Sequence, residues 1–391
     1  AGGNIFILLL SNGQAIASGD NNDGACVIPE LPEGKSYISS AVGTRHTVLL
    51  RDDGQVFAQG FNGARQCEIP TLPQDVKYTA VAAGAQHTVL LRSDGKVEAF
   101  GHCDDGQCDV PPLDVGLRYV GISAGYGHTV LLRSDGVALS FGINLFGRCD
   151  VPRLPSGLRC LGQSVAAHNE ITQSQPLGNE AEEEEEGIPA IEDEEEEAPL
   201  ILQEISAASI AKESEQCDQQ PQLISRVVEL ALRELPDLPR LLVVEFLARP
   251  RYVCAASGRM HTVLLRDDEK VVAFGWNRHG QCCVPALPKL NSLRYTALAA
   301  GGGHTVLLRS DGNVDTIGYN ANGQCNVPSL PKDMQYTAIA AGDQFTIVVR
   351  SDGLAIIVGK CEAFRDTSIE WILRSRNPDI QYIGVSAGGN I

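Results

Sequence analysis

The chain has 391 residues, 40 of them glycine, and a formal net charge of −18 at pH 7. Nucleic acid is disfavoured as a ligand, because phosphate backbones are bound by clustered Lys and Arg and the chain has no basic tail. The sequence contains neither a signal peptide nor an apolar run long enough to span a bilayer. We therefore expect no membrane insertion and an intracellular location, cytoplasmic or nuclear.

One short unit recurs along the chain and dominates its organisation. Its clearest copy is Gly-Ala-Gln-His-Thr-Val-Leu-Leu-Arg-Ser-Asp-Gly at residues 84–95. Each copy has one anchor position, and the anchors are Ile5, His46, His87, His128, His261, His304 and Phe345. They are 41 residues apart from the first to the fourth, and then 133, 43 and 41 apart. A period of this length predicts a solenoid or a propeller.

Each period contains three short β-rich runs and a brief fourth run that ends in proline. Around His87 these runs are residues 77–83, 87–92, 96–101 and 107–111. Gly and Asp-Gly turns separate them, and no helical periodicity fits inside the period. Four short strands in about 40 residues are typical of a propeller blade. The predicted fold is all-β, a seven-bladed β-propeller of about 41-residue repeats.

Side-chain size predicts the order of the strands within a blade. Only small side chains fit where blades converge on the axis, so the Val-Ala-Ala-Gly run should be innermost and the Pro-terminated run outermost, where a missing N–H is tolerated. Antiparallel strands reverse at each turn. The loops before the anchors and the Gly-x-Asn-x-x-Gly loops should therefore share one face, with the Ser-Asp-Gly turns on the other.

The sequence Gly-His-Thr-Val-Leu-Leu-Arg-Ser-Asp-Gly, followed by Phe-Gly-x-Asn-x-x-Gly-Gln-Cys, resembles the repeat of the regulator of chromosome condensation family. The resemblance covers residues 1–162 and 251–391 and implies a seven-bladed propeller. It implies little about function, since the family includes exchange factors for Ran-type GTPases, recognition parts of ubiquitin ligases, an ultraviolet-B receptor and plain scaffolds. The receptor role depends on a tryptophan cluster, and this chain has only Trp276 and Trp371.

The period breaks between the fourth and fifth copies. We expect blades one to four at residues 1–162, an insertion at 163–250, and blades five to seven with ring closure at 251–391. The insertion holds 21 of the 49 acidic residues, which leaves the propeller close to neutral. Its acidic blocks, Glu182–Glu186 and Glu192–Glu197, should be disordered. Residues 222–235 and 239–247 predict a helical hairpin, either packed on the propeller or serving as a docking helix for a partner.

The two ends of the chain carry the same five residues, Ala-Gly-Gly-Asn-Ile, at 1–5 and 387–391. We expect residues 386–391 to lie beside the first blade, because an inner strand with no partner would leave a raw sheet edge.

Histidines and cysteines recur at fixed blade positions, which predicts structural roles. One His per blade places the imidazoles around a circle, whereas a metal needs ligands that converge on one ion. The repeated cysteines should be reduced packing residues, because equivalent positions on different blades are too far apart to pair. They are Cys26, Cys67, Cys108, Cys149, Cys282 and Cys325. We expect neither a metal nor a cofactor.

Two blades depart from the pattern of the others. An Arg followed by Asp-Gly closes most hairpins, and Asp-Gly supplies left-handed turn geometry. Blade five has Asp268-Glu269 instead, which predicts a different turn. Blade seven lacks the Gly-Gln-Cys-x-x-Pro block, so its outer edge should be irregular, with a short helix at residues 367–374.

The sequence offers no catalytic residues, because no phosphate-binding loop, nucleophile elbow or zinc motif stands outside the repeats. The favoured function is a non-catalytic scaffold or substrate-recognition propeller that binds a protein. One alternative is a guanine-nucleotide exchange factor for a Ran-like small GTPase. Another is the recognition module of a ubiquitin ligase, with a ubiquitination substrate as partner. The oligomeric state is left open.

Comparison of the seven copies indicates where a partner binds. The residue after the third strand differs in every blade while its neighbours barely change, and the residues before each anchor also vary. Exposed aromatic and Arg side chains are enriched in binding hot spots. The candidate protein-binding residues are Arg45, Phe61, His102, Tyr126, Arg259, Trp276, Arg278 and Tyr319.

Overall fold

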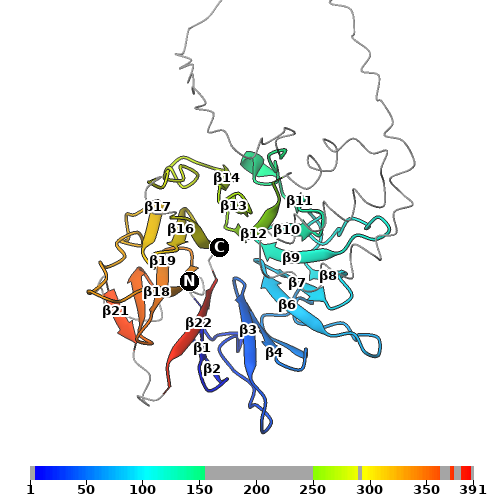
Figure 1. Ribbon diagram of the computed structural model, residues 1–391. Coiled ribbons are helices and arrows are strands. Elements are labelled where there is room, and N and C mark those ends of the chain that lie inside the picture. Colours follow the sequence, from blue (N-terminus) through cyan, green and yellow to red (C-terminus); the bar gives the residue numbers. More distant parts are fainter. Residues whose placement is uncertain (1–4, 155–249, 289–292, 362–369, 374–379, 389–391) are drawn as a thin grey trace, which may run out of the picture. The chain divides into compact units, whose positions relative to one another are not determined.

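The computed structural model describes residues 5–154, 250–288, 293–361, 370–373 and 380–388 (Figure 1). The chain divides into two units, of which one comprises Ala1–Pro155 with Pro250–Ile391 and the other Ser156–Arg249. The predicted acidic blocks and helical hairpin lie outside the described residues. No helix among the described residues is long and apolar enough to cross a membrane.

Seven antiparallel sheets, arranged around a common centre, make up the first unit (Figure 1). The predicted all-β, seven-bladed propeller is therefore confirmed. Blades one to four contain β22-β1-β2, β3-β4-β5, β6-β7-β8 and β9-β10-β11, and blades five to seven contain β12-β13-β14, β15-β16-β17 and β18-β19-β20-β21.

The strand bounds repeat closely from blade to blade. In the first half of the chain the strands are β1 (Phe6–Leu10), β2 (Ala15–Ser18), β3 (Tyr37–Val42), β4 (His46–Arg51), β5 (Val56–Gly60), β6 (Tyr78–Ala83), β7 (His87–Arg92), β8 (Val97–Gly101), β9 (Tyr119–Ala124), β10 (His128–Arg133) and β11 (Ala138–Gly142), followed by the short helix η1 (Leu145–Gly147). In the second half they are β12 (Tyr252–Ser257), β13 (His261–Arg266), β14 (Val271–Gly275), β15 (Tyr295–Ala300), β16 (His304–Arg309), β17 (Val314–Gly318), β18 (Tyr336–Ala341), β19 (Phe345–Arg350), β20 (Ala355–Gly359), β21 (Glu370–Leu373) and β22 (Tyr382–Ala387).

The predicted fourth strand is wrong for the blades that carry the Pro-terminated run. That run folds back on its own loop, where the Cys67 amide donates to Asn62 Oδ1 at 2.9 Å. Its proline carbonyl then accepts from a tyrosine of the next blade, as Pro70 does from Tyr78 at 3.0 Å. Because these groups are already satisfied and proline has no N–H, the run does not extend the ladder.

Blade seven shows the opposite departure. Where an irregular edge and a short helix were predicted, β21 pairs antiparallel with β20, from Ala355↔Leu373 to Val358↔Glu370. The blade lacks the loop that replaces the outer strand elsewhere, so the edge of β20 is open to a segment of high β-propensity.

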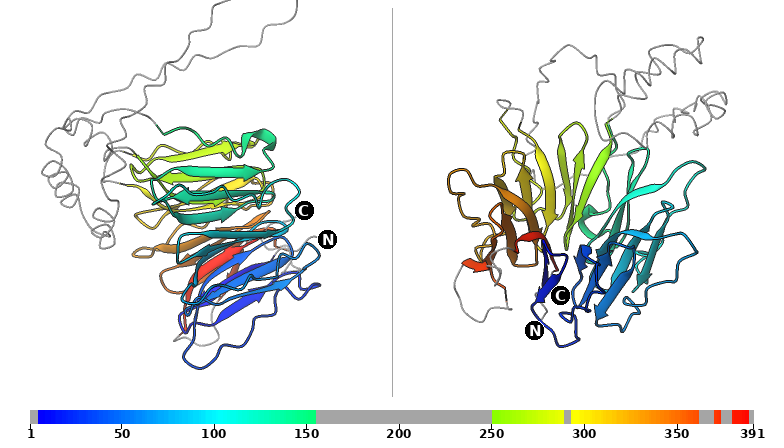
Figure 2. Two further views of the ribbon diagram at one scale, coloured as in Figure 1. Left: turned by 90° about the vertical axis from the view of Figure 1, so that its right-hand side faces the viewer. Right: turned by 60° about the horizontal axis from the view of Figure 1, so that its bottom comes forward.

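The last strand closes the ring. β22 pairs antiparallel with β1, with Ile7 opposite Ser386 and Phe6 opposite Ala387. It is therefore the inner strand of blade one, and the two strands lie side by side in every view (Figures 1 and 2). Ser386 also contacts Ser40 of β3 through their hydroxyl groups, at 2.7 Å. The prediction that residues 386–391 lie beside the first blade is confirmed for residues 386–388, and residues 389–391 lie outside the described residues.

A chain of hydrogen bonds joins neighbouring blades through the anchor histidines. Each Nε2 lies 2.8–3.1 Å from a threonine Oγ1 of the next blade. The pairs are His46–Thr88, His87–Thr129, His128–Thr262, His261–Thr305 and His304–Thr346. Each threonine donates its own proton to a loop carbonyl, as Thr88 does to Gln66 at 2.7 Å, so the imidazole must be the donor to Oγ1. The histidines thus have the predicted structural role.

The two interfaces of blade one lack this bond. Between blades seven and one, Phe345 meets Phe6 edge to face, with ring centroids 6.5 Å apart. Between blades one and two the anchor is Ile5, which is 1% exposed. Both positions keep the packing and replace the hydrogen bond by apolar contact.

The hairpins between the second and third strands of the blades have the predicted Asp-Gly turns, and blade five departs from the prediction. The Asp-Gly glycines have positive φ, for example 79° at Gly95 and 80° at Gly312. Glu269 of blade five adopts φ 67° and its amide donates to the Arg266 carbonyl at 3.1 Å, as Gly95 does to Arg92 at 3.0 Å. The prediction of a different turn is wrong, because the pairing of the flanking strands imposes the left-handed conformation on a glutamate.

One cysteine prediction is also wrong. Cys108 forms a disulfide with Cys103 inside its own loop. Cys103 occupies the position that asparagine holds in blades one, two, four, five and six, so the partner of Cys108 lies five residues away in the same loop and not on another blade. The remaining repeated cysteines are half-buried, and burial raises the pKa of Cys67 and Cys325 to about 11.

Candidate functional site

The variable loops lie at one end of the strands, on what we call the loop face. It is formed by the loops before the anchors (residues 43–45, 84–86, 125–127, 258–260, 301–303 and 342–344) and the loops after the third strands (residues 61–66, 102–107, 143–148, 276–281 and 319–324). Backbone hydrogen bonds of 2.8–2.9 Å join the two sets, as from the Phe61 amide to the Arg45 carbonyl and from Trp276 to Met260. The predicted sharing of one face is confirmed.

Blade two carries the first pair of candidate residues. The Arg45 guanidinium lies 4.5 Å from the centroid of the Phe61 ring, within range of a cation–π contact. The same guanidinium donates from Nε to Asp23 Oδ2 at 2.8 Å, and Nη2 forms an ion pair with that oxygen at 2.7 Å. Arg45 is therefore already neutralised by a neighbour, and Phe61 presents a half-buried ring.

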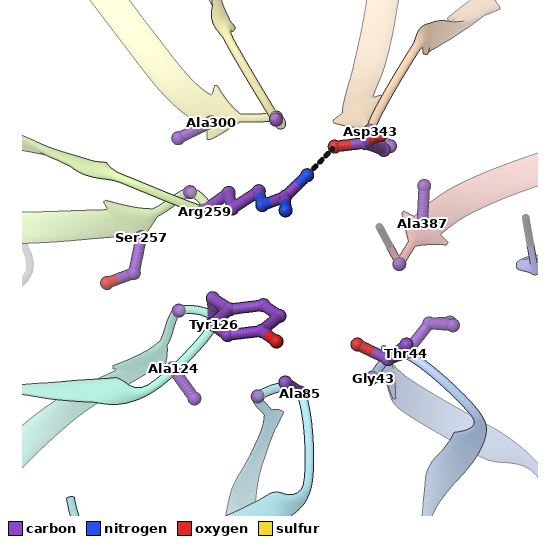
Figure 3. Close-up of a pocket in the computed structure, with 18 of the residues that line it drawn as sticks. Gly43, Thr44, Ala85, Ala124, Tyr126, Ser257, Arg259, Ala300, Asp343 and Ala387 are labelled. Carbon is purple, nitrogen blue, oxygen red and sulfur yellow. Dashed lines mark ion pairs between the residues drawn. The ribbon is translucent and has the colours of Figure 1, made fainter. Parts of the chain in front are cut away.

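A second group surrounds the mouth of a pocket at the centre of the ring, where the inner strands end in small residues. These residues enclose a cavity of about 100 Å³ (Figure 3). Tyr126 and Arg259 lie at its edge, with the guanidinium carbon 5.6 Å from the ring centroid. Arg259 reaches across the mouth toward Asp343, and Nη1 is 3.9 Å from Oδ1 (Figure 3). Burial raises the pKa of Asp343, while Arg259 acts in the opposite direction.

A third group forms a row of rings across blades four to six. Trp276 lies 6.4 Å from Phe146 and 5.0 Å from His279, measured between ring centroids. His279 lies 4.9 Å from Tyr319. We call Phe146, Trp276, His279 and Tyr319 the aromatic row. Trp276 and Tyr319 are half-buried, whereas Phe146 is 59% exposed.

Two candidate residues stand alone. His102 lies on the disulfide loop, where Nδ1 contacts Gln107 Nε2 at 3.0 Å and Nε2 is 3.5 Å from Asp104. Arg278 is exposed between Trp276 and His279 in the sequence. The eight candidates thus share a face without forming one site.

Sequence comparison missed Phe146, His279 and Asp343 as site residues. Each occupies a loop position that varies between blades, which was the available signal. Their importance comes from contacts between blades, and a repeat period does not show which side chains meet across a blade interface.

No catalytic arrangement is present on the part of the loop face that the structure describes. Its ion pairs are Arg259–Asp343 and Arg45–Asp23, and His102 lies beside Asp104; none of these pairs places a nucleophile beside a base. Among the described residues no group of three or more His, Cys, Asp or Glu could hold a metal ion. The arrangement offers aromatic rings, Arg side chains and one small polar cavity.

Comparisons with known proteins agree with this architecture. The family model described as "Regulator of chromosome condensation (RCC1) repeat" matches residues 295–324. These residues span β15 to the loop after β17, and the chain is accordingly an RCC1-like repeat propeller. No curated protein matches the sequence.

Solved structures similar to the chain are distant in sequence. Prp20p from Saccharomyces cerevisiae is 17% identical with a TM-score of 0.58, over 100% of this chain and 92% of its own. Human WBSCR16 is 14% identical with a TM-score of 0.56, over 99% and 97%. The ectodomain of the Arabidopsis thaliana receptor kinase ACR4 is 14% identical with a TM-score of 0.51, over 92% and 96%. At these identities the likeness concerns the fold.

Proposed function

We propose that the protein is a non-catalytic interaction propeller, a scaffold or a substrate-recognition part, that binds a protein partner through the loop face. The observation that carries this proposal is the contrast between repeated and divergent positions. The His–Thr bonds and the strand cores recur in almost every blade, whereas the half-exposed loop positions hold Phe61, Trp276 and Tyr319. Such aromatic side chains are enriched in binding hot spots.

The comparisons support a protein as the partner. The structure of Prp20p was described together with its binding properties to Gsp1p and histones. A guanine-nucleotide exchange factor for a Ran-like small GTPase is therefore the second candidate function, and recognition of a ubiquitination substrate is a third. We further propose an intracellular location, cytoplasmic or nuclear.

The division at residues 1–162, 163–250 and 251–391 remains part of the proposal. In this scheme the two outer segments build the propeller, and the insertion is either an accessory unit or a second recognition element. Its separate role is testable by replacing residues 163–247 with a short Gly/Ser linker.

The test compares both faces of the propeller. Trp276→Ala and Tyr319→Ala should each weaken the binding of a purified partner by about 2 kcal/mol or more. Arg92→Ala, on the face with the Asp-Gly turns, should change the binding free energy little. Loss of binding only when the insertion is replaced would assign recognition to that segment. Nucleotide release from a panel of Ran-like GTPases separates the two leading candidates, since clear acceleration by the intact chain would favour an exchange factor.

A further inference from the structure

The geometry points to the pocket at the centre of the loop face as a recognition site for one carboxamide side chain, Asn or Gln, at the tip of a turn of a protein partner. This inference rests on the proposed function and adds to it a place on the loop face and a chemistry of the partner.

The pocket is lined by equivalent residues of all seven blades, and one position in each blade sets its chemistry. The inner strand ends in a small residue, a glycine follows, and the next residue stands at the mouth; we call this the rim residue. In blades two to seven the rim residues are Thr44, Ala85, Tyr126, Arg259, Gly302 and Asp343. The polar side chains directed over the space therefore come from four of these residues (Figure 3).

Arg259 and Asp343 form an ion pair that is not closed. Nη1 lies 3.9 Å from Oδ1, which is beyond hydrogen-bond range, whereas the hairpin pair Arg309–Asp311 is closed at 2.6 Å. The Asp343 side chain is only 10% exposed, and its other oxygen accepts a long hydrogen bond of 3.4 Å from Gln344 Nε2. A carboxylate so deeply buried without a close donor is costly, so a donor supplied from outside would be bound favourably.

Gly302 explains why this carboxylate faces the pocket. A Cβ on Gly302 would collide with Asp343 Oδ1 and would lie 2.8 Å from its Cγ and 2.7 Å from its carbonyl oxygen. Gly302 has no positive φ, so its conformation does not require glycine. The missing side chain makes room for Asp343 to lean over blade six toward Arg259.

The charges at the pocket balance. Among the described residues that line it, only Arg259 and Asp343 are charged. Arg148 approaches from outside the lining and donates from Nη1 to the Arg259 carbonyl at 2.6 Å; burial lowers its pKa, and the Asp105 carboxylate acts in the opposite direction. The ion pair of blade two is closed at 2.7 Å. An ion of either sign would therefore meet a like charge in the pocket.

A carboxamide satisfies both members of the pair at once. Its oxygen would accept from Arg259, its NH2 group would donate to Asp343, and the Tyr126 and Thr44 hydroxyls can donate or accept. Lys or Arg would face Arg259, Asp or Glu would face Asp343, and an apolar group would leave the buried carboxylate without a donor.

The size of the pocket agrees with one short side chain. A volume of about 100 Å³ corresponds to about three water molecules at roughly 30 Å³ each. This volume is too small for a nucleotide. A turn of a protein bound to the loop face can place a single side chain there.

The experiment uses the full chain and a display library of short cyclic peptides. Enriched peptides should share one Asn or Gln. Synthetic versions in which Glu, Lys or Leu replaces that residue should each bind at least tenfold more weakly in a fluorescence anisotropy titration.

Two substitutions should exchange this specificity, which a misfolded variant would not do. Asp343→Asn removes the negative charge, so the Glu version of the peptide should bind this variant at least tenfold more tightly than it binds the unchanged protein. Arg259→Gln removes the positive charge and should have the same effect on the Lys version. The matched control is Arg294→Gln, since Arg294 lies 3.9 Å from Glu269 on the face with the Asp-Gly turns. It should change the affinity of the unaltered peptide less than twofold.

Peptides without a shared Asn or Gln would overturn the inference, as would a Glu version that gains no affinity for Asp343→Asn. A free primary amide such as propionamide that binds as tightly as the peptides would assign the pocket to a small molecule and contradict a protein partner. Peptides that ignore both pocket variants but depend on Trp276 would contradict the inference and still support binding by the loop face. Peptides that respond to Arg294→Gln and to no variant of the loop face would overturn the proposed function as well.

Discussion

Burial of the anchor histidines lowers their pKa values and thereby makes the stability of the fold depend on pH. Burial lowers the pKa of His87, His128 and His304 to about 3, and that of His46 and His261 to about 4. In the unfolded chain an imidazole has a pKa of about 6.5. The folded protein therefore keeps these side chains neutral at a pH where the unfolded chain binds protons.

We predict that the free energy of unfolding falls as the pH drops from 6.5 to 4. Within that window the unfolded chain binds more protons than the folded one, so acid favours unfolding by about 1.4 kcal/mol per pH unit for each histidine. His304→Phe should reduce the dependence of the free energy of unfolding on pH by the contribution of one histidine. Urea denaturation at a series of pH values between 6.5 and 4.5 measures this change.

This variant has a precedent inside the molecule, since Phe345 is an anchor with 0% exposure. Thr346 would still donate to the Gln324 carbonyl, at 2.8 Å, after the imidazole is gone. A pH slope identical to that of the unchanged protein would contradict the assignment of the titrating groups.

Glu269 is a second residue whose conformation carries a measurable cost. Its φ of 67° belongs to a glycine position, and its ion pair with Arg294, at 3.9 Å, joins two side chains that are more than half exposed. Glu269→Gly should raise the free energy of unfolding by about 1 kcal/mol, because glycine adopts this conformation without a steric penalty. Chemical denaturation measures the change.

The control for Glu269→Gly is the reverse change in blade six. Gly312→Ala places a methyl group at φ 80° and 2.5 Å from Gln335 Cβ, so it should destabilise by at least as much. Equal effects of the two substitutions, in the same direction, would show that the left-handed turn is not the cause.

At the level of elements, the sequence predicted three strands of each blade because each is a short apolar run between Gly or Asp-Gly turns. It failed for the outer run, where Asn62 and Tyr78 satisfy the backbone from the side. It failed again at β21, because the absence of the Gly-Gln-Cys-x-x-Pro block shows that the usual loop is missing but does not show that residues 370–373 pair with β20 in its place. The loop face could be predicted from strand reversal, whereas the aromatic row could not, because its rings come from three blades.

The loops themselves differ by one substitution that changes their chemistry. In five of them an asparagine Oδ1 accepts the amide hydrogen bond of the repeated cysteine, at 2.8–2.9 Å. The blade-three loop has Cys103 in that place and a disulfide to Cys108. Reduction of the disulfide should therefore leave this loop with neither the asparagine hydrogen bond nor the covalent link.

We predict that Cys103→Asn is more stable than the unchanged protein under reducing conditions, by about 0.5–1.5 kcal/mol, which is the net contribution of one hydrogen bond. Urea denaturation with and without dithiothreitol provides the comparison. Asn62→Ala, which removes the same bond from blade two, should cost a similar amount. If Cys103→Asn and the unchanged protein unfold at the same urea concentration under reducing conditions, the asparagine hydrogen bond does not stabilise the loop.

At the scale of the whole propeller, closure depends on one strand. β22 supplies the inner strand of blade one, and its Tyr382 and Val385 join the core that includes Phe6, Leu8 and Phe345. Deleting residues 382–391 should lower the melting temperature by several degrees, because β1 loses its inner partner and an open edge is left at the axis. Deleting only residues 389–391 is the control. Indistinguishable melts for the two truncations would mean that β22 does not stabilise the ring.

The pairing of β22 with β1 also has a consequence for folding during synthesis on the ribosome. β1, Phe-Ile-Leu-Leu-Leu, is buried at all five positions in the finished ring, yet the strand that covers its inner edge begins at Tyr382. At about 5–20 residues per second, translation separates the two strands by roughly 20–75 s. During that interval β1, one of the most apolar segments of the chain, lacks the strand that pairs with its inner edge in the folded protein. Nascent chains of this protein should therefore engage chaperones through their first strand.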